Sequence, residues 1–186
     1  MLTKHLPMLP AHAGAPVVSS ASVAYLPQAG GSITITGSFF DATATATVGG
    51  AACPVSGTPT TTSLTCTAPA MGSGGQAVVV TVNTVASGSA TTIAYLAAAT
   101  VASVTPAAVP MTGSSLTVTG TGFSTLSGAT AVTLGGVACG SLIVASSTSL
   151  TCTAASASSV AGAGQSVVVT VAGQASTGSA TLTYSE

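Results

Sequence analysis

Hydrophobic and polar residues alternate along the chain in short stretches that glycine, proline and serine separate. Ile33 and Ile35 alternate with threonines, and a longer valine-rich stretch, residues 76–83, has valine at the alternate positions 78, 80 and 82. Strict alternation over about four to eight residues is typical of a half-buried β-strand. In the first half of the chain, the pattern predicts strands at residues 17–25, 32–36, 43–48, 63–67, 76–83 and 90–96. No stretch has a helical period of useful length, so an all-β fold is expected.

One pair of segments occurs twice. Residues 48–53 (VGGAAC) and 63–67 (SLTCT) recur as 134–139 (LGGVAC) and 149–153 (SLTCT), at a numbering offset of 86. Later strands repeat as well, with offsets between 83 and 89 that change in the loops, where insertions are tolerated. A repeat of this length predicts two domains. We place them at 17–97 and 98–186, after an extended N-terminal tail at 1–16.

The predicted strands and turns indicate the architecture of each repeat. About seven short strands, with turn signals every eight to twelve residues, are the pattern of a β-sandwich. The connection at residues 96–101 contains neither glycine nor proline, which predicts a stiff link rather than a flexible one.

The second repeat resembles the IPT/TIG domain, an immunoglobulin-like module of plexins, hepatocyte-growth-factor-type receptors, Rel-type transcription factors and microbial surface proteins. The resemblance rests on residues 104–106 (VTP), 112–123 (TGSSLTVTGTGF), 135–139 (GGVAC), 147–152 (STSLTC) and 182–184 (LTY). The first repeat is a looser match, because AYLP at 24–27 stands at the opening and GSFF at 37–40 replaces a Gly-x-Gly-Phe turn. The resemblance implies two tandem immunoglobulin-like β-sandwiches. It implies no particular activity, because function has to be argued from sites.

The same resemblance implies one disulfide in each domain, since the family pairs the cysteines of these two motifs. The expected pairs are Cys53 with Cys66 and Cys139 with Cys152. Closing a loop of about 14 residues would stabilise a domain by roughly 3 kcal/mol in the chain-entropy model. Free buried thiols and metal binding are the alternatives, although zinc sites prefer closely spaced ligand pairs.

Composition argues against several functions. Only 2% of the residues are charged, namely Lys4, Asp41 and Glu186, against about 25% in an average domain. Acid–base catalysis needs two carboxylates or a histidine at a site, and His5 and His12 both lie in the tail. Phosphate contacts need several Lys or Arg, so nucleic acid is not an expected partner. We expect no enzyme, cofactor or metal site, no membrane span, and a turn role for Asp41.

The tail resembles a weak secretory signal, but its apolar region is short and contains Pro7 and Pro10, so a structural tail is favoured. Sandwiches have edge strands that accept an added strand from another chain. The hypothesis is that the tail docks on a neighbouring subunit in a head-to-tail homopolymer, and the alternative is that it packs on its own first domain. The residues expected to fill apolar grooves are Leu2, Leu6, Met8 and Leu9.

These observations predict a structural subunit of an extracellular filament, surface appendage or fibrous coat. The near absence of charge favours association, and the many serines and threonines make O-linked glycans expected partners. The alternative is a spacer or ligand-binding pair of IPT/TIG repeats from a larger adhesin or receptor ectodomain. A threonine ladder for ice at Thr43, Thr45 and Thr47 is a further alternative, although the predicted partner strand lacks a matching array.

Overall fold

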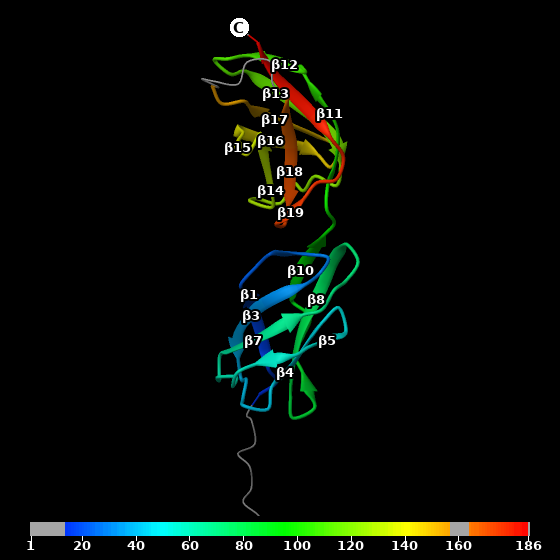
Figure 1. Cartoon of the computed structure of the whole chain (residues 1–186). Coiled ribbons are helices and arrows are strands. Elements are labelled where there is room, and N and C mark those ends of the chain that lie inside the picture. Colours follow the sequence, from blue (N-terminus) through cyan, green and yellow to red (C-terminus); the bar gives the residue numbers. More distant parts are fainter. Residues whose placement is uncertain (1–13, 157–163, 186) are drawn as a thin grey trace, which may run out of the picture. The chain divides into compact units, whose positions relative to one another are not determined.

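The structure, a computed structural model, describes residues 14–156 and 164–185 of the 186-residue chain. These residues form twenty β-strands and no helix (Figure 1), which confirms the all-β prediction. The strands of the first domain are β1 (Val17–Ala21), β2 (Tyr25–Pro27), β3 (Gly31–Ser38), β4 (Thr45–Val48), β5 (Ala51–Cys53), β6 (Val55–Ser56), β7 (Ser63–Ala68), β8 (Gly74–Val82), β9 (Val85–Ala86) and β10 (Thr91–Leu96). The strands of the second domain are β11 (Thr100–Thr105), β12 (Ala108–Pro110), β13 (Ser115–Thr121), β14 (Thr130–Leu134), β15 (Val137–Ala138), β16 (Gly140–Ser146), β17 (Ser149–Thr153), β18 (Gln165–Val171), β19 (Gln174–Ala175) and β20 (Ala180–Ser185).

Each domain is a sandwich of two sheets with the same strand order. The first domain has a sheet β1-β3-β7-β6 and a sheet β2-β10-β8-β4-β5, with β9 beside β8. The second domain repeats both orders with each strand label ten higher. Pairing is parallel between β2 and β10 and between β12 and β20, and it is antiparallel in pairs such as β3 with β7 and β13 with β17. The two repeats of the sequence therefore have the same topology.

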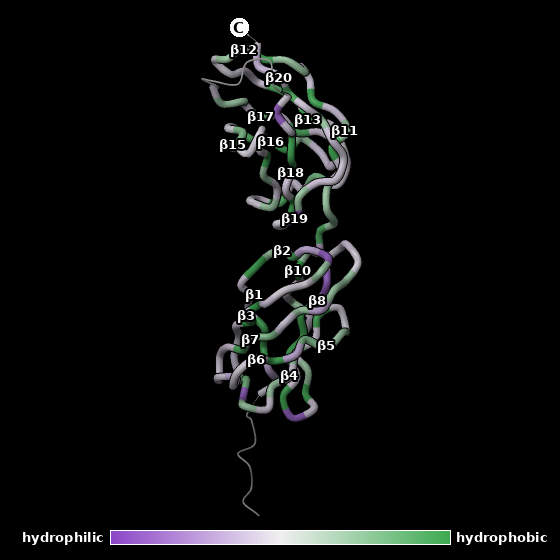
Figure 2. The backbone as a smooth tube through the Cα atoms, in the orientation of Figure 1, coloured by the Kyte–Doolittle hydropathy of each residue, from purple (hydrophilic) through white to green (hydrophobic). Residues whose placement is uncertain are grey.

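The alternating hydrophobic positions form the core. Ile33 and Ile35 of β3 lie opposite Cys66 and Leu64 of β7, and all four side chains are buried. The facing sheet contributes every second residue of β8, and in the second domain β13, β17, β18 and β20 contribute in the same way. Along the backbone, the most hydrophilic colour is confined to a few short stretches (Figure 2). The alternation of Ile33 and Ile35 with threonine, and of the valines in β8, thus corresponds to strands with one buried face, as the pattern predicts.

The predicted strand at residues 17–25 is wrong in one respect, because it is two strands in different sheets. β1 pairs with β3, whereas β2 pairs with β10. Between them, the Thr34 amide donates to the Ser22 hydroxyl (3.0 Å) and the Ser22 amide donates to the Thr34 carbonyl (2.8 Å). The chain then crosses to the other sheet. A period-2 pattern shows which side a residue faces, but it does not show which sheet the strand joins.

Candidate functional site

The cysteines join the two sheets of each sandwich. Cys53 bonds to Cys66 and Cys139 to Cys152, with Cα–Cα distances of 5.5 and 5.8 Å. Cys53 ends β5 in one sheet and Cys66 lies in β7 of the other. This is the pairing that the resemblance predicts, and it leaves none of the four as a free thiol.

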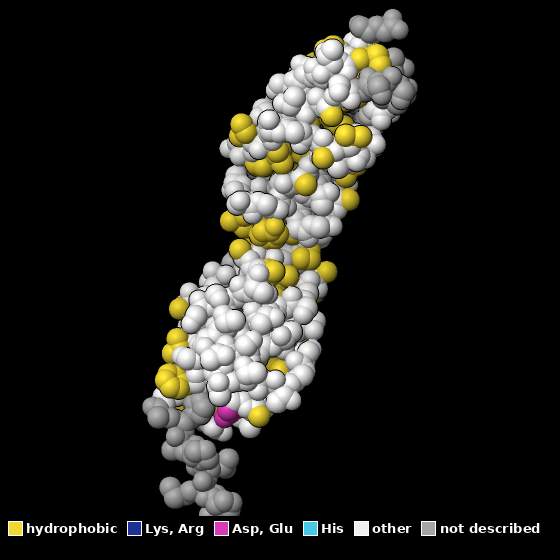
Figure 3. Space-filling model, turned by 90° about the vertical axis from the view of Figure 1, so that its left-hand side faces the viewer, with side chains coloured by type: hydrophobic (Ala, Val, Ile, Leu, Met, Phe, Trp, Pro, Cys, Tyr) yellow, Lys and Arg dark blue, Asp and Glu magenta, His cyan; other side chains and the backbone are white. Residues whose placement is uncertain are grey.

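Asp41 is the one charged side chain among the residues that the structure describes, and one face of the molecule shows it as an isolated magenta patch (Figure 3). Its carboxylate accepts hydrogen bonds from the Thr43 amide (2.7 Å), the Thr43 hydroxyl (2.6 Å) and the Asn83 side chain (3.4 Å). Asp41 therefore braces the loop before β4, which is the turn role that the sequence predicts. Thr43 precedes β4 and its hydroxyl is bound to Asp41. Of the three threonines in the alternative ice-binding ladder, only Thr45 and Thr47 therefore lie on β4.

Chemically active groups are scarce in the described ranges, 14–156 and 164–185. No cluster of three or more His, Cys, Asp or Glu is found there that would hold a metal ion. Nor do those ranges include a helix of the length and hydropathy needed to cross a membrane. Burial raises the pKa of the Tyr95 phenol above its ordinary value of 10.0, so this side chain stays neutral within the core.

Hydroxyl groups cover the outer face of one sheet in each domain, and they pair with one another across strands. Ser20 shares a hydrogen bond with Thr36 (2.6 Å), and Thr34 shares one with Thr65 (3.0 Å). In the second domain, Ser103 and Thr119 form the pair that corresponds to Ser20 and Thr36 (2.6 Å), and Thr100 shares a further hydrogen bond with Thr121 (2.5 Å). Such cross-strand pairs stabilise a sheet, and they give the molecule a polar surface without charge.

The two domains differ most at one sheet edge. β6 of the first domain has two residues, whereas its counterpart β16 has seven and is the last strand of its sheet. Ile143 in β16 is 64% exposed, the largest exposure among the large hydrophobic side chains of the described residues. The neighbours Leu142 and Val144 are half-buried, and both pack against the core of the second domain. This edge carries no charge.

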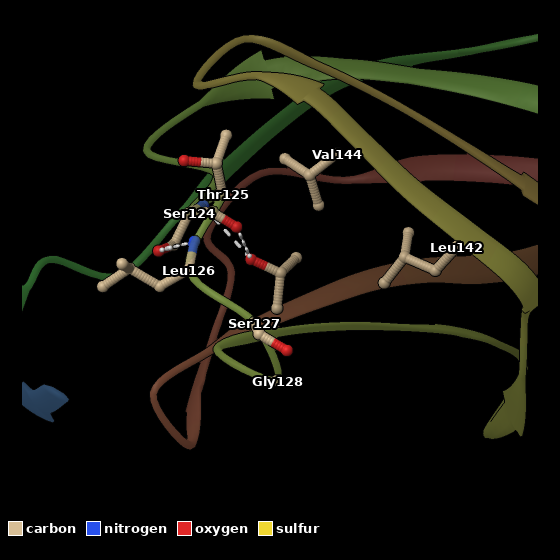
Figure 4. A pocket seen from close by; sticks show the side chains of 8 residues that line it. Ser124, Thr125, Leu126, Ser127, Gly128, Leu142 and Val144 are labelled. Atoms are coloured by element: carbon tan, nitrogen blue, oxygen red, sulfur yellow. Dashed lines mark hydrogen bonds between the residues drawn. The ribbon is translucent and has the colours of Figure 1, made fainter. Parts of the chain in front are cut away.

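A groove of about 230 Å³ lies next to β16. Leu142 and Val144 form one side, and the loop between β13 and β14, including Leu126, forms the other (Figure 4). The Thr130 hydroxyl donates to the Ser124 carbonyl (2.8 Å) and accepts from the Ser124 amide (3.1 Å). The loop is therefore braced by its own hydrogen bonds, and the groove combines hydroxyl and aliphatic side chains.

The sequence explains why this edge and groove occur in the second domain. Between the cysteines, the first repeat reads PVSGTPTTTSLT, with Pro54 and Pro59, whereas the second reads GSLIVASSTSLT without proline. Proline has no amide hydrogen to donate to a ladder, so it shortens a strand. Phe123 corresponds to Phe40 at an offset of 83 residues, whereas Leu134 corresponds to Val48 at an offset of 86. The loop beside the groove is therefore three residues longer than its counterpart in the first domain.

The predicted assembly residues Leu2, Leu6, Met8 and Leu9 lie outside the described residues. The edge formed by β16 was not among the sites predicted from the sequence. The signal that would have found it is the difference between the two repeats within the 13-residue cysteine spacing. There, Leu142, Ile143 and Val144 replace Ser56, Gly57 and Thr58, and the flanking prolines of the first copy become Gly140 and Ala145.

The fold and the disulfides define a class of protein with two immunoglobulin-like β-sandwiches in tandem. Residues 16–95 and 99–184 both match the IPT/TIG domain. The chain belongs to the IPT/TIG domain family.

Similar folds are found among solved structures. The full extracellular region of plexin A4 matches in two structures. One, with domains 1 to 10, has 20% identity and a TM-score of 0.59, and the match covers 100% of this chain and 17% of that chain. The other, with domains 1 to 8, has 21% identity and a TM-score of 0.55, with 91% of this chain and 18% of that chain covered. This chain thus spans less than a fifth of those proteins' length, and the likeness at this identity concerns the fold. No curated protein matches the sequence.

Proposed function

We propose that this protein is a structural subunit of an extracellular filament, surface appendage or fibrous coat, and that it assembles as a homopolymer. The observation that carries the proposal is the long, uncharged and apolar edge strand β16 on a molecule with almost no charge. An exposed edge presents unpaired amide and carbonyl groups that another chain can extend. The described residues supply no charged side chain on that edge to prevent it.

The rest of the surface favours the same role. A net charge of −1 on 186 residues gives little repulsion between copies. Paired hydroxyls keep the outer faces polar, and one disulfide links the sheets of each small domain. Disulfides persist in oxidising compartments, which supports an extracellular or cell-surface location. The scarcity of acid–base groups supports a role without catalysis, and a single lysine with no arginine supports one without nucleic-acid binding.

The proposed assembly uses the N-terminal segment as the connector to a neighbouring subunit. Deleting residues 1–13 leaves every described strand and both disulfides in the chain. The full chain should form large species in sedimentation velocity and filaments in electron micrographs. The truncated chain should give the same circular dichroism spectrum but sediment as a monomer. A full chain that stays monomeric at high concentration would overturn the proposal.

O-linked glycans on the exposed serines and threonines are a secondary part of this proposal. Exposed hydroxyls such as Ser20 and Ser103 are accessible on the outer faces of both domains. The intact mass of the protein from its native source should exceed the sequence mass of 17.3 kDa by multiples of a sugar residue. A mass that equals the sequence mass removes this part without affecting the assembly.

The groove favours a second candidate function, in which the repeats are a spacer or ligand-binding part of a larger adhesin or receptor ectodomain. Its volume of about 230 Å³ lies below the roughly 300–1,000 Å³ of typical small-molecule pockets, so it suits a few side chains or a short segment. In this case, the protein should remain monomeric at high concentration in the sedimentation experiment above.

A further inference from the structure

β16 is the edge strand best suited to accept another strand in the described part of the chain. It is longer than the edge strands β1 and β11, which have five and six residues. β11 is also partly covered, because the Val101 amide donates to the Thr177 carbonyl (2.9 Å). Natural edge strands are usually protected by charged residues, proline, very short length or β-bulges. β16 has no charged residue, no proline and seven residues. Its pairing with β17 is irregular between Gly140 and Ile143 and between Val144 and Ser146, so the regular part of this edge is centred on Ile143 and Val144.

The side chains of β16 form an apolar surface on both faces of the position that an added strand would take. Leu142 and Val144 point toward the groove, and the loop that contains Leu126 lies on its other side, with the Leu126 side chain directed away from them (Figure 4). Successive side chains of a strand point to opposite faces, so Ile143 is on the other face, 64% exposed. A strand added to β16 would place alternate side chains over the groove and over Ile143, and β16 presents aliphatic side chains on both of these faces.

Residues 1–13 of the chain are long enough to supply such a strand, although Pro7 and Pro10 have no amide hydrogen to donate to the ladder. At roughly 3.3 Å per residue, they reach about 40 Å when extended, against about 23 Å for the seven residues of β16. Their large apolar residues are Leu2, Leu6, Met8 and Leu9, and Lys4 is the one charged side chain. Residues 2–6 precede Pro7, so all five have an amide hydrogen to donate. Leu6 and Met8 would lie on the same face of an extended segment, together with Leu2 and Lys4.

We propose that residues 1–13 of one copy bind as an added strand along β16 of a second copy, with Leu6 and Met8 in the groove that Leu126, Leu142 and Val144 line. This inference rests on the proposed homopolymer and names its acceptor. The second domain accepts the strand, because the corresponding edge of the first domain is limited to Val55–Ser56 and follows Pro54. The added strand and the accepting strand β16 are different parts of the sequence, so the contact between two copies is heterologous. Each copy can then bind the next in the same way.

The direct experiment is photo-crosslinking in the full-length protein. A photo-reactive amino acid replaces His5, beside Leu6 but outside the apolar set, in copies grown with a heavy isotope. These copies are mixed with unmodified light copies, assembled and irradiated. Mass spectrometry then identifies the linked peptides. The expected product joins heavy position 5 to residues 140–146 of a light copy. Links within one copy, links elsewhere on the neighbour, or no link at all would each overturn the acceptor assignment.

Two variants give an independent reading by sedimentation. Ile143→Lys adds a charge to the proposed edge and should reduce the assembled fraction at least tenfold, with an unchanged circular dichroism spectrum. Val137→Lys is the matched control, because Val137 is 58% exposed on β15, at the edge of the other sheet of the same domain. It should assemble like the unmodified protein.

The outcomes separate this inference from the proposed function. If the unmodified protein does not assemble, the homopolymer itself is wrong and the acceptor is wrong with it. If it assembles and Ile143→Lys assembles equally well, the homopolymer stands and the acceptor lies elsewhere. If both lysine variants fail equally, the loss is a general effect of added charge, and the assignment to β16 is again overturned.

Discussion

At the scale of single residues, two glycines decide how closely the first strand of each domain approaches the next. Gly37 lies opposite Val18, at the irregularity between β1 and β3, and Gly120 lies opposite Val101 in the second domain. A Cβ atom on Gly37 would overlap the Val17 carbonyl oxygen and approach the Phe40 ring at 2.7 Å. The obstacle is backbone, so the strands would have to move apart.

We therefore predict that Gly37→Ala lowers the free energy of unfolding by roughly 1–3 kcal/mol, the range typical of overpacking. Gly88→Ala is the control in the same domain, because nothing lies within 4 Å of the place that an added Cβ atom would take there. Urea denaturation should leave the control within about 1 kcal/mol of the parent or slightly more stable. Equal effects of the two substitutions would show that the close approach at Gly37 is not the cause.

The buried tyrosine predicts a pH dependence at the alkaline end. The pKa of Tyr95 is raised in the folded state by burial, whereas in the unfolded chain it is about 10. The unfolded state then loses its proton first as the pH rises, so stability is fully present below about pH 10 and falls above it. Urea denaturation between about pH 8 and 11 should show this decline, and Tyr95→Phe should weaken it. The same slope in both proteins would contradict the assignment to Tyr95.

At the scale of elements, the disulfide holds together strands of different sheets. Cys53 and Cys66 enclose a short edge strand and a loop, and their side chains are buried inside the sandwich. A crosslink across a loop of this size lowers the conformational entropy of the unfolded chain more than that of the folded chain. The same arrangement recurs between Cys139 and Cys152, so each domain contains its own crosslink.

Replacing Cys53 and Cys66 together by alanine should lower the free energy of unfolding of the first domain by roughly 3 kcal/mol. The second domain keeps its disulfide and should unfold as before, which serves as the internal control. Guanidinium denaturation followed by tyrosine fluorescence separates the two transitions, since Tyr95 lies in the first domain and Tyr184 in the second. A simultaneous loss in both domains would contradict independent crosslinks. Non-reducing peptide mapping should find no bond between the domains.

At the scale of the whole molecule, the near absence of charge predicts how the proposed assembly would respond to salt. Exposed charges interact over a Debye length of about 10 Å at 0.1 M salt, but the described residues carry Asp41 alone. Hydrophobic contacts and strand pairing are not screened by sodium chloride. The assembled fraction should therefore stay constant between low and high sodium chloride, as measured by sedimentation, and rise in ammonium sulfate, which strengthens apolar burial. Dissolution of the assemblies by moderate sodium chloride would indicate a charged interface instead.

The sequence by itself determined the all-β fold, the repeat and the inward positions of residues such as Ile33, Ile35 and Leu64. These features depend on local alternation and on motifs that recur along the chain, so they can be read one segment at a time. The resemblance to a family supplied the cysteine pairing, which spacing alone does not give.

Only the tertiary structure decided which strands share a sheet and which edges remain exposed. Residues 17–25 divide into β1 and β2 because Ser22 bonds to Thr34, a contact between positions far apart along the chain. The edge at Ile143 arises because β17 pairs with β16 on one side and nothing in the described sheet follows β16. Sheet membership depends on long-range hydrogen bonds, and no local pattern encodes which partner a strand will find.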